Sequence, residues 1–194
     1  MTELNAVGDV VLTEPRAMLA LADASRLALH DELRRGGPAT AGDLASRLGS
    51  NEPELLRQLE TLEDVGLVER GEPNAGDRQP VWSAVGKGII FEIPEDAEGQ
   101  NAARALSNTM LLQYVDLPRS WVTDDEPRLS PEWARAAGLL NVRLLVTSDE
   151  LRDIQSAFEG VLEPYLTRRP DDVPAGASRA RLLSYFMPEP PQRD

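Results

Sequence analysis

The feature that most constrains the fold is a pair of short leucine-rich segments on either side of a glycine turn. The first stripe has apolar residues spaced i, i+3, i+4, i+7: Ala41, Leu44, Ala45 and Leu48. The second stripe is Leu55, Leu56, Leu59 and Leu62. This spacing predicts two helices that each bury one face, joined by a tight turn at Gly49-Ser50.

The helix starts carry capping signals. Thr40 can cap the first helix, with Asp43 in its first turn. Asn51 followed by Glu54 resembles a capping box with Asn in place of Ser or Thr. We therefore expect both helices to begin at these residues.

The flanking segments complete one N-terminal domain over residues 14–95. Helices are predicted from Glu14 and over residues 26–35, the second capped by Ser25. Residues 67–70 and 81–85 read as two paired strands around a Gly- and Pro-containing loop. Residues 1–13 give only the signal of a weak edge segment.

Three stretches of this domain resemble known proteins. Residues 21–27 (LADASRL), 43–49 (DLASRLG) and 59–68 (LETLEDVGLV) resemble stretches of ArsR-like transcriptional regulators. The resemblance covers residues 14–90, about half of the chain. It implies a winged helix-turn-helix fold and a regulator that binds duplex DNA as a homodimer on two-fold sites.

In such a protein the second helix presents its N-terminal end to the major groove, and the strand pair contacts the DNA backbone. The expected base-reading residues are Asn51, Glu54, Arg57 and Gln58. The expected phosphate-binding residues are Thr40, through its place at a helix start, with Arg47, Arg70 and Arg78.

The charge of the chain supports an alternative. The net charge is −13, and residues 1–95 alone carry 9 basic and 17 acidic side chains. Glu52 and Glu54 stand where relatives carry hydrogen-bond donors, and carboxylates near phosphates oppose binding. The second hypothesis is a winged-helix module that binds a protein or senses a small molecule, with weak or no DNA affinity.

The sequence lacks the residues that Cys/His metal sites, disulfide bonds and phosphate-binding loops require. The chain has no cysteine and one histidine, His30, which excludes disulfides, thiolate metal sites and the Cys/His ligand sets of metal sensors. His30 falls on the buried side of its predicted helix. Gly86-Lys87-Gly88 lacks the residues of a phosphate-binding loop. We expect no enzyme activity, no metal and no cofactor.

The absence of an early basic and apolar segment, and of any run of about 20 apolar residues, predicts a cytoplasmic protein that does not associate with membranes.

The second half, residues 96–194, is predicted to be a smaller helix-strand-helix-strand module for dimerisation or effector binding, which makes the fold class α+β. Its predicted elements are a helix over 100–117, a strand over 139–146, a helix opened by Thr147 and a strand over 180–187.

Two features of this half leave alternatives open. A helical stripe either mediates dimerisation or packs on its own domain: Leu106, Met110, Tyr114 and Leu117. Trp121 and Trp133 either line a pocket for a small-molecule effector or anchor the charged loop between them.

Overall fold

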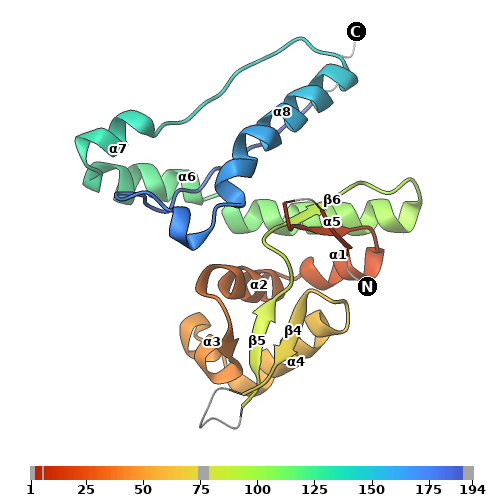
Figure 1. Cartoon of the computed structure of the whole chain (residues 1–194). Coiled ribbons are helices and arrows are strands. Elements are labelled where there is room, and N and C mark those ends of the chain that lie inside the picture. The colour runs from red at the N-terminus through yellow and green to blue at the C-terminus, as the bar shows by residue number, and fades with distance from the viewer. Residues whose placement is uncertain (1–2, 6, 74–78, 190–194) are drawn as a thin grey trace. The chain divides into compact units, whose positions relative to one another are not determined.

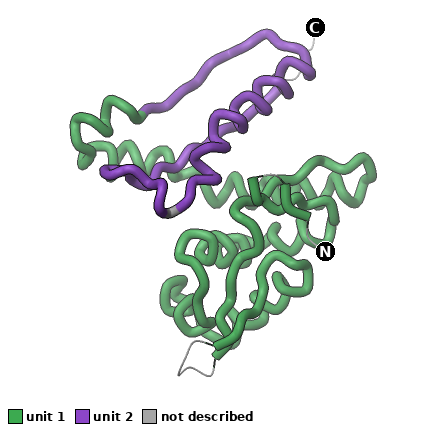
Figure 2. The backbone as a smooth tube through the Cα atoms, in the orientation of Figure 1, with its two compact units in different colours: residues 1–137 green, residues 138–194 purple. Residues whose placement is uncertain are grey.

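The computed structural model describes residues 3–5, 7–73 and 79–189. The chain divides into two compact units, residues 1–137 and 138–194 (Figure 2). The functional division at residue 95 stays a prediction. The first unit extends past that residue because the helix that follows it packs against the first helices of the chain.

Four helices form the N-terminal part of the first unit (Figure 1). They are α1 (Pro15–Leu21), α2 (Ala24–Gly36), α3 (Ala41–Leu48) and α4 (Glu52–Glu63). The cap of α2 is Asp23 and not the predicted Ser25. The Asp23 carboxylate accepts hydrogen bonds from the backbone N–H groups of Ser25 and Arg26, both at 3.0 Å.

The strands on either side of the predicted loop form a small antiparallel sheet. Its strands are β3 (Ala39–Thr40), β4 (Val68–Gly71) and β5 (Val81–Ala84) in the order β3-β5-β4. Gly66 ends the turn after α4 with a φ of +74°, where glycine is unstrained. The predicted strand pair is confirmed, with Arg70 opposite Trp82.

A second sheet includes part of the N-terminal segment, residues 1–13, for which the sequence predicted only a weak edge segment. It contains β1 (Glu3–Leu4), β2 (Val10–Leu12) and β6 (Ile89–Phe91) in the order β1-β2-β6. Strand β2 runs parallel to β6, with Val10 opposite Ile89. Val10 and Leu12 are buried in the core, so the first strands are part of the folded unit.

Helix α5 (Ala97–Tyr114) packs its N-terminal half into this core and is capped by Asp96. Two polar contacts tie its C-terminal half to the earlier helices. The Thr109 hydroxyl donates to the backbone carbonyl of Ala22 at 2.9 Å, and the Tyr114 hydroxyl donates to the Asp31 carboxylate. Helix α5 therefore belongs to the N-terminal core.

Short helical turns complete the first unit. They are α6 (Leu117–Ser120), a π-helical turn (Trp121–Asp125), a 3-10 turn (Glu126–Arg128) and α7 (Pro131–Ala136). The π-helical and 3-10 turns lie in the charged segment between Trp121 and Trp133 that the sequence predicted as a loop. Ser130 caps α7, accepting from the Trp133 N–H at 3.4 Å.

The second unit contains α8 (Ser148–Leu166) and a 3-10 turn (Pro170–Asp172). The predicted capping box is confirmed, because the Thr147 hydroxyl accepts from the Glu150 N–H while the Glu150 carboxylate accepts from the Thr147 N–H. Phe158 and Phe186 meet edge to face with ring centroids 6.1 Å apart. Within residues 138–189 as described, no side chain is buried.

The two strands predicted for this unit are not formed. The structure gives no strand pairing within residues 139–146 or 180–187. Alternating apolar residues stabilise a strand only when a neighbouring strand accepts its backbone hydrogen bonds, and the described part of this unit supplies none. The α+β class is confirmed, and the helix-strand-helix-strand description of the second half is wrong in its strands.

Candidate nucleic-acid interface

Helices α3 and α4 are joined by a tight turn. Gly49 has a φ of +63°, the left-handed conformation that ends a helix, and the Ser50 N–H donates back to the Ala45 carbonyl at 3.0 Å. Asn51 then caps α4, accepting from the Glu54 N–H at 3.0 Å. The predicted cap is confirmed, although the Glu54 side chain bonds elsewhere and does not close a box.

One face of α4 is fixed in the core and the other is open. Leu55, Leu59 and Leu62 are at most 2% exposed, which holds the helix axis in place. Arg57, Glu60 and Thr61 on the opposite side are exposed. A rigid helix with an exposed polar side meets the geometric need for insertion into a groove.

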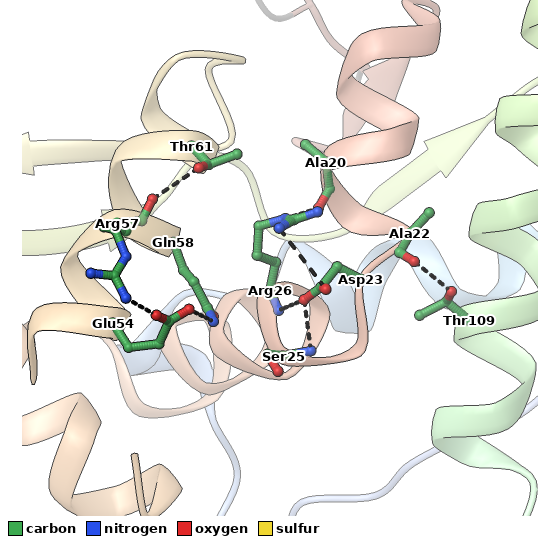
Figure 3. A network of polar contacts seen from close by, with 10 residues as sticks. All are labelled: Ala20, Ala22, Asp23, Ser25, Arg26, Glu54, Arg57, Gln58, Thr61 and Thr109. Atoms are coloured by element: carbon green, nitrogen blue, oxygen red, sulfur yellow. Dashed lines mark hydrogen bonds and ion pairs between the residues drawn. The ribbon is translucent and has the colours of Figure 1, made fainter. Parts of the chain in front are cut away.

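The polar side of α4 is an internally bonded cluster around Glu54 (Figure 3). The Glu54 carboxylate accepts from Gln58 Nε2 at 3.1 Å and forms an ion pair with Arg57. The hydrogen bond from Gln58, followed by the bond and charge of Arg57, lowers the pKa of Glu54 below its ordinary value. Glu54 is therefore ionised at neutral pH, and it offsets the charge of Arg57.

The strand pair β4–β5 lies beside α4 and is held to it by two contacts. The Arg70 guanidinium stacks over the buried Trp82 ring, 4.6 Å from its centroid, and pairs with Glu63 of α4 at 2.9 Å. Gln79 Nε2 donates to Glu52 Oε1 at 2.8 Å. These contacts set the strand pair relative to α4. Arg78 lies outside the described residues.

Helix α3 presents the other predicted contacts. Arg47 Nη1 lies 3.6 Å from Glu32 Oε1, and the same carboxylate pairs with Arg35 at 2.6 Å. The Thr40 hydroxyl donates to the Asp43 carboxylate at 2.8 Å and accepts from the Asp43 N–H at 3.2 Å. The bond from the Thr40 hydroxyl, followed by one from the Thr40 backbone N–H, lowers the pKa of Asp43, so a negative charge sits at this helix start and disfavours a phosphate there.

The described candidate arginines share one property. Arg47, Arg57 and Arg70 each pair with a carboxylate, and each side chain remains 43–68% exposed. Exposed ion pairs of this kind contribute little to stability and break at small cost. Sequence reasoning gave the arginines but missed the partners Glu32 and Glu63, because these pairs join different elements.

A half-open groove of about 430 Å³ lies between the N-terminus of α2 and α4. Its floor includes Ala28 and Leu55, and its polar rim includes Ser25, Glu54 and Gln58. The two residues Glu54 and Gln58 thus belong both to the groove and to the polar side of α4.

His30 is fully buried, as its position in the helix predicted. Neither ring nitrogen makes a hydrogen bond of good geometry within the described residues, and the contact with the Leu67 backbone is only a weak one. Burial, followed by the charge of Arg34, lowers its pKa from 6.5 to about 4, against the smaller opposing effects of Asp31 and the Leu67 backbone. The ring is therefore neutral at pH 7.

The family comparison covers this region. A family model described as a helix-turn-helix domain matches residues 21–71, which include α2, α3, α4 and β4. Residues 21–71 form a helix-turn-helix domain. Such a domain indicates a DNA-binding regulator, because its second helix is the element that enters the major groove. No curated protein matches the chain.

The antiparallel strand pair after α4 makes this a winged helix-turn-helix domain, in which β4 and β5 are the strands of the wing. Among the residues described, no group of three His, Asp or Glu side chains could hold a metal ion. No helix in the described ranges is long and apolar enough to cross a membrane.

The four predicted dimerisation residues lie in different surroundings. Leu106 is fully buried in the core and Met110 packs partly against it. The Tyr114 hydroxyl bonds to Asp31, and Leu117 opens α6 half-buried. The exposed apolar residues of this helix are its neighbours Leu111, Leu112 and Val115, at 47–67% exposure.

Proposed function

We propose that this protein is a transcriptional regulator of the ArsR-like type that acts in the cytoplasm and binds duplex DNA as a homodimer, without sensing a metal. The observation that carries the proposal is the exposed polar side of α4, held on a buried leucine face and flanked by the wing. The resemblance of residues 21–27, 43–49 and 59–68 supports the ArsR-like assignment.

In the proposed complex, Asn51, Glu54, Arg57 and Gln58 reach base edges in the major groove. Asn51 uses its side-chain oxygen as the cap, so its amide N–H groups remain donors. Glu54 accepts from a cytosine amine, which releases Arg57 for a guanine or a phosphate.

Arg47 and Arg70 neutralise phosphates after exchanging their carboxylate partners, and the role of Arg78 stays a prediction from the sequence. Thr40 contributes only by capping α3, because the Asp43 carboxylate disfavours a phosphate at that helix start. A homodimer would place the two copies of α4 about 34 Å apart, one helical turn of DNA. The exposed Leu112 and Val115, next to the predicted stripe, fit a dimer contact better than the buried Leu106.

The test is a binding assay on genomic fragments at low salt with fluorescence anisotropy. Wild type should bind a subset of fragments at submicromolar concentration, and Arg57→Ala should weaken binding at least tenfold on the bound fragments. Arg16→Ala is the matched control, because Arg16 is equally exposed but lies on α1, paired with Asp64. Absence of any fragment bound below micromolar protein contradicts the proposal.

The second candidate function is a winged-helix module for a protein or small-molecule partner, with weak or no DNA affinity. The carboxylate pairing of Arg47, Arg57 and Arg70 favours it, and the groove beside Glu54 and Gln58 offers a place for an effector. Retention on DNA that is absent, or that does not change with salt, would favour this candidate over the first.

A further inference from the structure

The segment between α7 and α8 has the pattern of a strand without a strand partner. Leu140, Val142, Leu144 and Val146 alternate with Asn141 and Arg143. The four apolar side chains are 38–87% exposed. The chain is extended here and forms no strand pairing with the described residues (Figure 1). An exposed ion pair joins Arg143 of this segment to Glu189, with Nε and Oε1 3.5 Å apart.

The second unit cannot bury this segment by itself. None of its described side chains is buried, and α8 also leaves Ile154, Val161 and Tyr165 at 36–65% exposure. Pairing with residues 180–187 of the same chain would give two parallel strands with one helix, and such pairs are stable only when both faces are covered. A second copy supplies both another strand and another helix.

We propose that residues 139–145 pair antiparallel with the same residues of a second copy, around a two-fold axis at Val142. This surface lies outside the stripe considered above for dimerisation. The inference rests on the homodimer of the proposed function and on no DNA contact.

The register follows from the side chains. With the axis at Val142, Leu140 lies opposite the partner's Leu144 on one face. On the other face Leu139 lies opposite the partner's Leu145, and Asn141 opposite the partner's Arg143. Every large apolar residue of 139–145 then meets an apolar residue, and the arginine meets a neutral amide.

The neighbouring registers of this strand pair place unfavourable side chains opposite each other. A shift of the register by one residue places the apolar face of one strand, which carries Leu140, on the same side of the sheet as the partner's face that carries Asn141. An axis at Arg143 sets two arginines directly opposite each other, a repulsive cross-strand pair. An axis at Asn141 sets Leu139 opposite the partner's Arg143. The isologous pairing at Val142 is therefore the favoured one.

Because the chain has no native cysteine, a single introduced cysteine can form a disulfide only with its copy in a second chain. Val142→Cys in the full-length protein should form a disulfide-linked dimer under mild oxidation, because residues on the axis have Cα atoms about 4.5–5.5 Å apart, within disulfide range. Asn141→Cys is the matched control, because it leaves the ion pair of Arg143 with Glu189 in place. Two residues of offset place its Cα atoms about 8 Å apart, so its cross-linking should be about tenfold slower.

The double variant Leu140→Cys/Leu144→Cys should also cross-link, while each single variant should not. Sedimentation of the wild type, and circular dichroism of each variant, accompany the gel. Cross-linking of Val142→Cys no faster than that of Asn141→Cys overturns the strand pairing. If sedimentation still gives a dimer in that case, the homodimer of the proposed function stands. A monomer at all concentrations overturns both, and DNA binding is then tested separately by the anisotropy assay.

Discussion

At the scale of single residues, the buried His30 has a direct effect on stability. Its pKa is about 4 in the folded chain against 6.5 when exposed. The unfolded chain therefore binds the proton more readily, and stability is highest above pH 6.5 and falls as the pH drops toward 4. The loss over this window is on the order of 3 kcal/mol.

Replacing His30 by Gln should remove this dependence. Urea unfolding measured between pH 8 and pH 4 should give a free energy of unfolding that falls more steeply for wild type than for His30→Gln. Carboxylates that titrate below pH 5 affect both proteins equally, so the difference between the two curves isolates the histidine. Parallel curves would contradict a neutral buried ring.

Glu54 gives the second prediction at this scale, which rests on the proposed function. Glu54→Gln removes the carboxylate that pairs with Arg57, so Arg57 can neutralise one more phosphate. Nonspecific DNA affinity should rise, and its salt slope should steepen by up to about 0.9. Glu60→Gln removes the same charge from an exposed site of the same helix. An equal effect of both variants would mean that net charge alone is responsible.

At the scale of elements, the cap of α3 should contribute measurably to stability. Thr40→Ala removes the two hydrogen bonds of the Thr40 hydroxyl with Asp43 but keeps the bond from the Thr40 backbone N–H, and it should lower the free energy of unfolding by about 1 kcal/mol. Thr61→Ala is the control, because its hydroxyl only bonds to the Arg57 carbonyl inside α4. That change should be within about 0.5 kcal/mol of neutral. Both values come from urea titrations followed by circular dichroism.

The elements predicted correctly from the sequence are those with local signals. The leucine spacing gave α3 and α4, and Thr40, Asn51 and Thr147 marked helix starts because a cap involves residues only three apart. The wing strands were visible from their apolar residues and the loop between them.

The elements that were missed depend on distant partners. Strand β2 pairs with β6 about 80 residues away, so the residues near Val10 carry no local signal that predicts this strand. The pairing of Arg47 with Glu32 and of Arg70 with Glu63 is likewise set by tertiary structure. The segment 139–146 has the right alternation, but a strand exists only where a second strand meets it.

At the scale of the whole molecule, the buried residues are unevenly distributed. Every buried hydrophobic side chain that the structure describes falls between Val10 and Leu106. A chain ending at Ala137 should therefore keep the melting temperature of the first unit within a few degrees. Thermal scans of both chains at equal, low concentration check this. A large drop would show that residues 138–194 stabilise the first unit.

The position of β2 bears on where this fold begins. Val10 and Leu12 are core residues of a strand that precedes the first helix, although the helix-turn-helix motif starts later in the sequence. A fragment that begins at residue 14 would lose the burial of these two side chains, which stabilises the fold by about 1.5–3 kcal/mol for each. Expression tags should therefore be attached, and N-terminal truncations made, before Glu3. A DNA-binding fragment designed from the helix-turn-helix motif alone would lack two residues of its hydrophobic core, Val10 and Leu12.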